Sequence, residues 1–123
     1  MITMIVFVRR VHTFSREEFT RYWHDQHGPL VMRTPEFMQY VHKYVQHHYA
    51  PGHAAAGSLF GDITDYDGVG EIWFDSRESM NTAFNEPRYL EIIKPDERTF
   101  IDIDKCLSFI SEEHVMIDKI ASK

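Results

Sequence analysis

Residues 2–9 form a short apolar run, rich in β-branched side chains, that predicts a β-strand. Alternate positions of a strand fall on opposite faces of the sheet. Both sets are apolar here, with Met4, Val6 and Val8 on one face and Ile5 and Phe7 on the other. A strand that is apolar on both faces is typical of the middle of a sheet that is covered on both sides.

The next segment carries the start signal of a helix. Ser15 and Glu18 have the spacing of a capping box, in which the two side chains bind backbone N–H groups of the first turn. Aromatic residues then recur with helical spacing at Phe19, Tyr22 and Trp23. The Gly-Pro dipeptide at 28–29 predicts the end of this helix.

Three further strands are expected along the rest of the chain. Residues 38–49 and 69–75 alternate and are rich in residues that favour strands, and residues 104–117 give the last strand. Residues 50–68 contain one proline and four glycines and show no lasting periodicity. This composition predicts a long loop, and long loops in compact domains often serve as lids over a binding site.

Two more helices are predicted between the last two strands. Asp75 or Ser76 caps the first of them, and a shorter helix opens at Pro87 and closes at Pro95. The resulting order of elements is strand, helix, strand, strand, helix, strand. This is the order of the α+β, ferredoxin-like split βαβ fold with a four-stranded antiparallel sheet. We therefore expect residues 1–123 to form a single domain.

The expected helices leave one face of the sheet uncovered. Two helices can cover only one face of a four-stranded sheet. Since the first strand is apolar on both faces, the second face also needs a cover, and a second copy of the sheet is the simplest one. We expect a homodimer in which two sheets pack face to face.

The composition limits the partners and the compartment. The chain has 123 residues and a formal charge of −6, whereas nucleic acids and anionic membranes bind basic surfaces, so we expect neither as a partner. No apolar run approaches the length of about 20 residues that spans a bilayer. Cys106 is the only cysteine, which excludes a disulfide framework and is typical of a reducing compartment. A cytoplasmic location is expected.

His27 is the strongest candidate for catalysis among the eight histidines. On a helical wheel it lies near Trp23 and Phe19, on the apolar side and at the C-terminal end of the first helix. The helix dipole raises the pKa of a histidine at this place and burial lowers it, which suits general acid–base catalysis near neutral pH. The structural alternative is a core histidine that caps the last helical turn.

The segment from Ser15 to Leu30 has the pattern Ser-x-x-Glu-Phe-x-x-Tyr-Trp-x-x-x-His-Gly-Pro-Leu and resembles the signature of the EthD-like family in the dimeric α+β-barrel superfamily. The resemblance extends over most of the domain and implies a ferredoxin-like fold, a homodimer and an acid/base role for His27. Similar proteins include methylmuconolactone isomerases and the dehydratases and decarboxylating enzymes of polyketide pathways. The isomerases also use a cysteine, a role that we do not transfer to Cys106 in the last predicted strand.

A second group of histidines, His42, His47, His48 and His53, follows along the strand at 38–49 and the loop after it. His42 and His48 share one strand face and His47 lies on the other, so a common metal site would need a sharp bend. We expect no metal here. The sequence also lacks a Gly-x-Gly-x-x-Gly nucleotide fingerprint, and we expect no cofactor.

Several aromatic and histidine side chains could line a pocket for a planar, oxygenated ligand. The predicted substrate-binding residues are Tyr22, Trp23, Tyr40, His42, Tyr44, His47 and Trp73. A tyrosine hydroxyl could donate a hydrogen bond to a phenol, an enolate or a lactone carbonyl. The same aromatic residues could instead fill the core of a small domain. An exposed surface is predicted for the acidic residues Glu78, Glu86, Glu91, Asp96 and Glu97.

These features favour a cofactor-independent acid/base enzyme of the isomerase, dehydratase or decarboxylase type that acts on an aromatic, polyketide-like or lactone small molecule. His27 would move a proton at a carbon next to a carbonyl group. A second hypothesis is an oxidoreductase or a cofactor-free monooxygenase. A third is a non-catalytic accessory protein that binds a small ligand. The fold alone does not decide among them.

Overall fold

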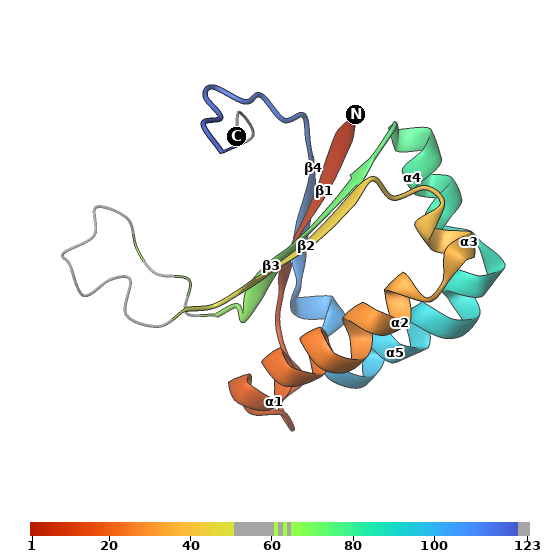
Figure 1. Ribbon diagram of the computed structural model, residues 1–123. Coiled ribbons are helices and arrows are strands. Elements are labelled where there is room, and N and C mark those ends of the chain that lie inside the picture. Colours follow the sequence, from red (N-terminus) through yellow and green to blue (C-terminus); the bar gives the residue numbers. More distant parts are fainter. Residues whose placement is uncertain (51–60, 62, 64, 121–123) are drawn as a thin grey trace.

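The centre of the protein is a four-stranded antiparallel sheet with the strand order β2-β3-β1-β4 (Figure 1). The computed structural model describes residues 1–50, 61, 63 and 65–120. The strands are β1 (Ile2–Val8), β2 (Lys43–His48), β3 (Gly68–Phe74) and β4 (Leu107–Ser111). The predicted α+β, ferredoxin-like arrangement is therefore confirmed, with β1 in the middle of the sheet.

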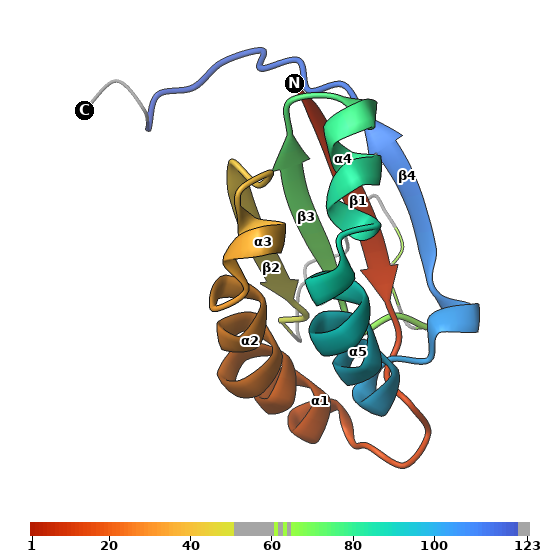
Figure 2. The ribbon, with the colours of Figure 1, turned by 90° about the vertical axis from the view of Figure 1, so that its right-hand side faces the viewer.

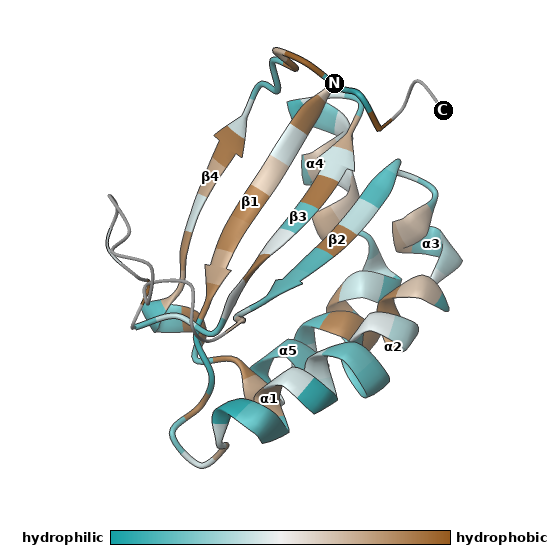
Figure 3. Cartoon of the chain, turned by 60° about the vertical axis from the view of Figure 1, so that its left-hand side comes forward, coloured by the Kyte–Doolittle hydropathy of each residue, from teal (hydrophilic) through white to brown (hydrophobic). Residues whose placement is uncertain are grey.

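The two faces of the sheet have different surroundings. All described helices lie on one side, and the strands cross behind them (Figures 1 and 2). On the other face, Ile5 of β1 lies opposite Glu71 of β3 and Phe109 of β4. The side chains of Leu107 and Phe109 are more than half exposed there, at 59% and 53%. Figure 3 shows that β1 is hydrophobic over most of its length. We call this second side the open face.

The first helix begins as predicted but continues beyond its predicted end. Ser15 and Glu18 form both hydrogen bonds of the capping box. The segments that follow are α1 (Arg16–Tyr22), a π-helical turn (Trp23–His27) and α2 (Gly28–Met32). The prediction that Gly28-Pro29 ends the helix was wrong. The N–H of Gly28 bonds the carbonyl of Trp23 five residues earlier, and this wider turn leaves room for the ring of Pro29.

The second helical stretch also continues beyond a proline, after a π-helical turn. Its segments are α4 (Arg77–Phe84), a π-helical turn (Tyr89–Ile93) and α5 (Lys94–Phe100). Ser76, one of the two predicted caps, begins α4. Pro95 does not close the helix as predicted, because the N–H of Lys94 bonds the carbonyl of Tyr89 five residues earlier. Pro95 then lies in the first turn of α5, where no N–H is needed.

The strand that was predicted over 38–49 is shorter in the structure. Pro35 begins a short helix, α3 (Pro35–Met38), because proline is favourable in the first turn. The strand β2 therefore starts only at Lys43. Of the loop that was predicted over 50–68, residues 51–60, 62 and 64 lie outside the described residues, and Gly68 already belongs to β3.

The last predicted strand, 104–117, is also shorter. A 3₁₀ turn (Ile103–Lys105) precedes β4, which ends at Ser111. Beyond it, Val115 and Met116 are exposed, and no described strand pairs with them. An apolar sequence pattern alone does not make a strand where the chain has no neighbouring strand to bind.

The core lies between the helices and the sheet in two clusters. In one cluster the ring centroids of Phe37 and Phe74 are 6.4 Å apart. In the other, the ring of Phe19 lies 5.4 Å from that of Phe100. All four side chains are almost fully buried, and aromatic pairs at such distances contribute beyond their buried area. The two clusters hold the helices against β1 and β3.

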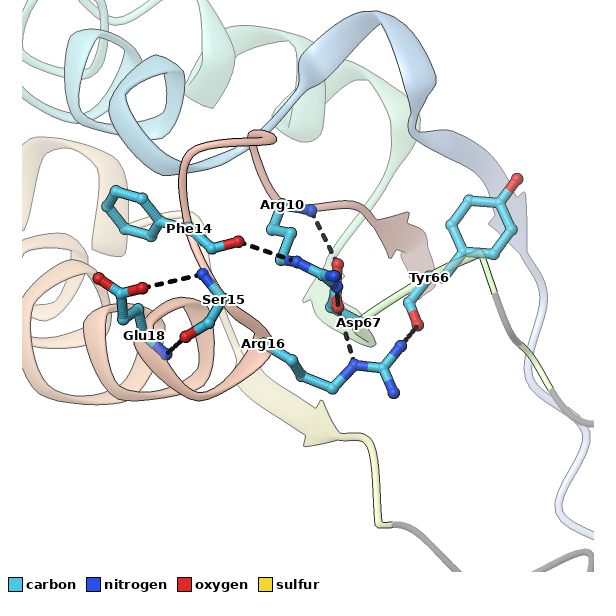
Figure 4. A network of polar contacts seen from close by, with 7 residues as sticks. All are labelled: Arg10, Phe14, Ser15, Arg16, Glu18, Tyr66 and Asp67. Atoms are coloured by element: carbon cyan, nitrogen blue, oxygen red, sulfur yellow. Dashed lines mark hydrogen bonds and ion pairs between the residues drawn. The ribbon is translucent and has the colours of Figure 1, made fainter.

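A buried carboxylate ties the start of α1 to the sheet. Asp67, which directly precedes β3, accepts hydrogen bonds from the backbone N–H of Arg10 at 2.8 Å and from Nε of Arg16 at 2.9 Å (Figure 4). The Arg10 guanidinium forms a further ion pair with Asp67. Arg16 also donates to the carbonyl of Tyr66, and Arg10 to the carbonyl of Phe14. This network compensates the cost of burying the charge of Asp67 and fixes the helix relative to the strands.

Candidate active site

A pocket of about 360 Å³ opens between the two core clusters, with helices on one side and the sheet on the other. Its walls are mostly apolar, including Met4 and Val6 of β1 and Ile72 of β3. The polar side chains on its wall include His27, Tyr44, Tyr89, Glu97, Cys106 and Ser108. An apolar pocket of this size with a few polar groups is typical of a small-molecule site.

His27 lies on the pocket wall, at the last position of the first π-helical turn. It is only 4% exposed, and its ring centroid is 5.0 Å from that of Phe100. Its Nδ1 lies 2.8 Å from Oδ2 of Asp96, in the first turn of α5. Since Asp96 does not line the pocket, Nε2 is the ring nitrogen that can meet a molecule bound there.

Asp96 connects two side chains of the first helix. Its second carboxylate oxygen accepts a hydrogen bond from the hydroxyl of Tyr22. Burial lowers the pKa of His27 below its usual value, and the hydrogen bond and charge of Asp96 act in the opposite direction. The neutral imidazole can therefore donate its Nδ1–H to Asp96 and keep the lone pair of Nε2 for a proton.

Glu97, the next residue of α5, reaches the pocket from the same helix turn. Its Oε1 accepts a hydrogen bond of 2.7 Å from the hydroxyl of Tyr89. Burial raises the pKa of Glu97 to about 7. Burial and the nearby Glu97 carboxylate also raise the pKa of Tyr89, so this hydroxyl stays protonated. A carboxyl group that exchanges a proton near neutral pH thus shares the pocket with His27.

Tyr44 reaches the pocket from β2, on the sheet side. The amide nitrogen of Gln46 donates to the Tyr44 oxygen at 2.8 Å and to the carbonyl of Trp23 at 3.0 Å. Burial raises the pKa of Tyr44, so that its hydroxyl remains protonated. Because the Tyr44 oxygen is an acceptor in the bond with Gln46, its own hydrogen is available to a bound molecule.

The structure brings three of the predicted site residues together. His27, Trp23 and Tyr44 all line the pocket. Tyr22 was predicted to bind substrate, but its hydroxyl donates to Asp96 and its side chain does not line the pocket. Its position makes it a neighbour of the catalytic candidate rather than a part of the pocket wall.

Four other predicted residues lie away from this pocket. Tyr40 packs against the core, and His42 is exposed. His47 and Trp73 face the open side of the sheet, where His47 forms an ion pair with Glu71. Because side chains alternate along a strand, these two residues point away from the helices and the pocket.

Asp96 and Glu97 were predicted on an exposed surface, and this was wrong. The side chain of Asp96 is only 16% exposed, and Glu97 lines the pocket. The error follows from ending the helix at Pro95, since the continued helix turns both carboxylates inward. A helical spacing that runs through the proline was visible in Tyr89, Ile93 and Phe100.

The described residues contain no candidate metal site and no candidate membrane-spanning helix. Within residues 1–50, 61, 63 and 65–120, no three His, Cys, Asp or Glu side chains come together in a way that could hold a metal ion. His53 of the predicted histidine group lies outside these residues. None of the described helices is long and apolar enough to cross a membrane.

Solved structures share this architecture at low sequence identity. An EthD family protein from Bacillus halodurans matches with a TM-score of 0.65 and 18% identity, over 93% of this chain and 99% of that chain. An EthD-like protein from Ralstonia eutropha matches with a TM-score of 0.62 and 18% identity, over 98% and 96% of the two chains. A dimeric ferredoxin-like protein of unknown function from Bacteroides fragilis has a TM-score of 0.61 and 9% identity, over 91% and 95%.

The family comparison covers both helical stretches of the candidate site. No curated protein matches the chain. The EthD domain model, however, matches residues 12–104, which include both helical stretches and the pair of His27 and Asp96. Since this match spans most of the 123 residues, the protein belongs to the EthD domain family.

Proposed function

We propose that this protein is an enzyme that moves a proton at a carbon atom next to a carbonyl group of an aromatic, polyketide-like or lactone molecule. The observation that carries the proposal is the placement of His27. Its Nδ1 is held by Asp96, outside the pocket, and its ring forms part of the wall of an apolar pocket. A histidine oriented by a carboxylate is the arrangement that a general base needs.

The proposed reaction begins at Nε2 of neutral His27. This nitrogen takes a proton from the substrate carbon, the electron pair of the C–H bond forms a C=C bond, and the carbonyl oxygen becomes an enolate oxygen. Asp96 stabilises the positive imidazolium through Nδ1–H. The hydroxyl of Tyr44 can donate to the enolate oxygen. Return of the proton to another carbon gives an isomer. If the imidazolium instead gives the proton to a hydroxyl on the carbon next to the C=C bond, the hydroxyl leaves as water, the carbonyl forms again and a dehydrated product results.

Deuterium exchange tests this proposal directly. Anthrone and a methylbutenolide are incubated with the protein in D₂O, and NMR follows the loss of the signal of the acidic C–H. The wild-type protein is expected to accelerate exchange for at least one probe, and His27→Gln is expected to lower the acceleration by about 100-fold or more. The melting temperature should stay nearly unchanged, because glutamine is also polar and of similar size.

A matched control is available on the same helical turn. The side chain of His24 is 75% exposed, so His24→Gln should exchange like the wild type. Unchanged exchange in His27→Gln would refute the assignment. Oxygen uptake with anthrone, without exchange, would favour a cofactor-free monooxygenase, and binding without either reaction would favour an accessory protein.

We also propose that the protein is a homodimer whose sheets pack through their open faces. The open face carries exposed apolar side chains, including Leu107 and Phe109, and the similar protein from Bacteroides fragilis is described as dimeric. Sedimentation should give the mass of two chains at micromolar concentration. Phe109→Glu places a charge on this face and should give monomers. A monomeric wild-type protein would contradict the proposal.

A further inference from the structure

The proposed reaction gives no role to Glu97, the one carboxyl group among the described residues that line the pocket. Glu97 accepts a hydrogen bond of 2.7 Å from the hydroxyl of Tyr89, whereas His27 is bonded to Asp96. The charge of Glu97 also acts on Tyr44, from the sheet, and on Cys106, from the segment before β4. Glu97 is therefore near pocket residues from several elements.

Within the described part of the chain, no lysine or arginine side chain balances this carboxyl group inside the pocket. Among the described residues that line it, none is a lysine or an arginine. Lys94 and Arg98 lie on the same helix as Glu97, but both are exposed and neither lines the pocket. A carboxylate ligand would thus meet an apolar wall, a neutral imidazole and a second carboxyl group.

From this arrangement we infer that Glu97 determines which ligands the pocket admits: it accepts uncharged hydroxy-aromatic or cyclic ketone molecules and excludes their carboxylated counterparts. The inference rests on the proposed function, for which it names the substrate class. Two carboxylates in one small apolar enclosure repel each other strongly, because little water is present to screen them. A protonated Glu97 can instead donate a hydrogen bond to a carbonyl or phenol oxygen. Exclusion by repulsion is a common source of specificity.

The exclusion should depend on pH in a definite direction. Burial raises the pKa of Glu97 to about 7, so the group is mostly neutral below this pH and mostly negative above it. The groups around Glu97 that can carry charge or titrate are Tyr89, Tyr44, Cys106, Asp96, Lys94, Arg98 and, across the pocket, His27. Burial raises the pKa of the tyrosines and the cysteine, so they stay neutral over the same range. Deprotonation of His27 would act in the same direction, so stronger exclusion above neutral pH reports Glu97 when it is lost in Glu97→Gln.

A pair of probes with the same ring system tests the inference. Between about pH 5.5 and pH 8.5, 2-naphthol is neutral and 2-naphthoate is an anion, as expected from ordinary phenol and carboxyl pKa values. Calorimetry measures the Kd of both probes for the wild-type protein and for Glu97→Gln. We expect the wild type to prefer 2-naphthol by at least about tenfold at pH 8, with a smaller preference at pH 5.5. Glu97→Gln should reduce the preference at pH 8 to about threefold or less and remove its pH dependence.

Two further variants separate this inference from a structural effect and from the proposed reaction. Tyr89→Phe removes the hydrogen bond to Glu97 but keeps the carboxyl group, so the preference for 2-naphthol should persist. His27→Gln should also keep the preference, because binding needs no proton transfer. Equal preference in the wild type and Glu97→Gln would overturn the inference. A wild-type preference that does not change with pH would also overturn the inference, and this test needs no variant. A wild-type protein that binds neither probe would overturn it as well.

Discussion

Replacing Glu97 by glutamine should stabilise the protein above neutral pH. The folded protein raises the pKa of Glu97 from 4.5 to about 7, mainly because burial disfavours the charged form. The folded state therefore holds this proton more tightly than the unfolded chain does. By linkage, the free energy of unfolding falls as the pH rises from about 4.5 through about 7. Glutamine cannot ionise, so the variant does not lose this stability.

The size of the effect follows from the two pKa values. Each pH unit between them corresponds to about 1.4 kcal/mol, so ionisation of Glu97 costs the folded wild type about 3 kcal/mol at pH 8. At pH 4.5 the same group costs less than about 1 kcal/mol, because it is mostly protonated in the folded state. The carbonyl oxygen of glutamine can still accept the hydrogen bond from Tyr89. The difference between the variant and the wild type should therefore grow by about 3 kcal/mol between pH 4.5 and pH 8.

Urea unfolding, followed by the fluorescence of the buried Trp23 and Trp73, measures this difference at both pH values and at one protein concentration. Glu91→Gln is the matched control, since Glu91 lies in the same helical stretch but its side chain is 63% exposed in a surface pair with Arg88. That variant should differ from the wild type by less than about 1 kcal/mol at both pH values. If the difference between Glu97→Gln and the wild type is the same at pH 4.5 and pH 8, the carboxyl group does not titrate as argued.

Two further substitutions test the geometry of the site. Asp96→Asn should lower deuterium exchange by about 100-fold or more, with little change in melting temperature. The amide can donate to Nδ1 of His27, which places the ring proton on Nε2 and leaves no base in the pocket. Exchange at the wild-type rate would contradict the role of this carboxylate. Gly68→Ala should lower the free energy of unfolding by about 2 kcal/mol, because its Cβ would lie 2.3 Å from the carbonyl oxygen of His47. Gly70→Ala is the control, measured by the same urea unfolding, since its Cβ would lie at an ordinary 3.5 Å from its nearest neighbour; equal losses in the two variants would refute the contact.

The parts of the fold that the sequence predicts well are those with a local signal. The two apolar faces of β1 follow from alternation, and the capping box of Ser15 and Glu18 marks the start of α1. His27 could be selected because its helical position coincides with a family motif. In each case the information lies within a few residues of the element that it specifies.

The parts that could not be predicted depend on long-range contacts or on an exception to a local rule. The rule that proline ends a helix fails at Pro29 and Pro95, because a π-helical turn precedes each of them. Asp96 is 69 residues from His27 along the chain, so their pairing appears only when the π-helical turn Trp23–His27 lies against α5. The alternation of β2 does not show which of its faces meets the helices, and for that reason both His47 and Tyr44 were predicted to bind substrate.

The two π-helical turns make the site sensitive to the number of residues in its helices, as well as to their identity. Each turn contains one residue more than an α-helical turn of the same height. If one residue were deleted between Trp23 and His27, the wide turn could close into a regular α-helical turn, and the helical segments on either side would keep nearly the same relative orientation. The room that the wide turn leaves for the ring of Pro29 would then be lost, and the ring would clash with a carbonyl of the preceding turn and distort the helix beside the pocket. We therefore expect natural variation at this position to replace residues but to preserve their number.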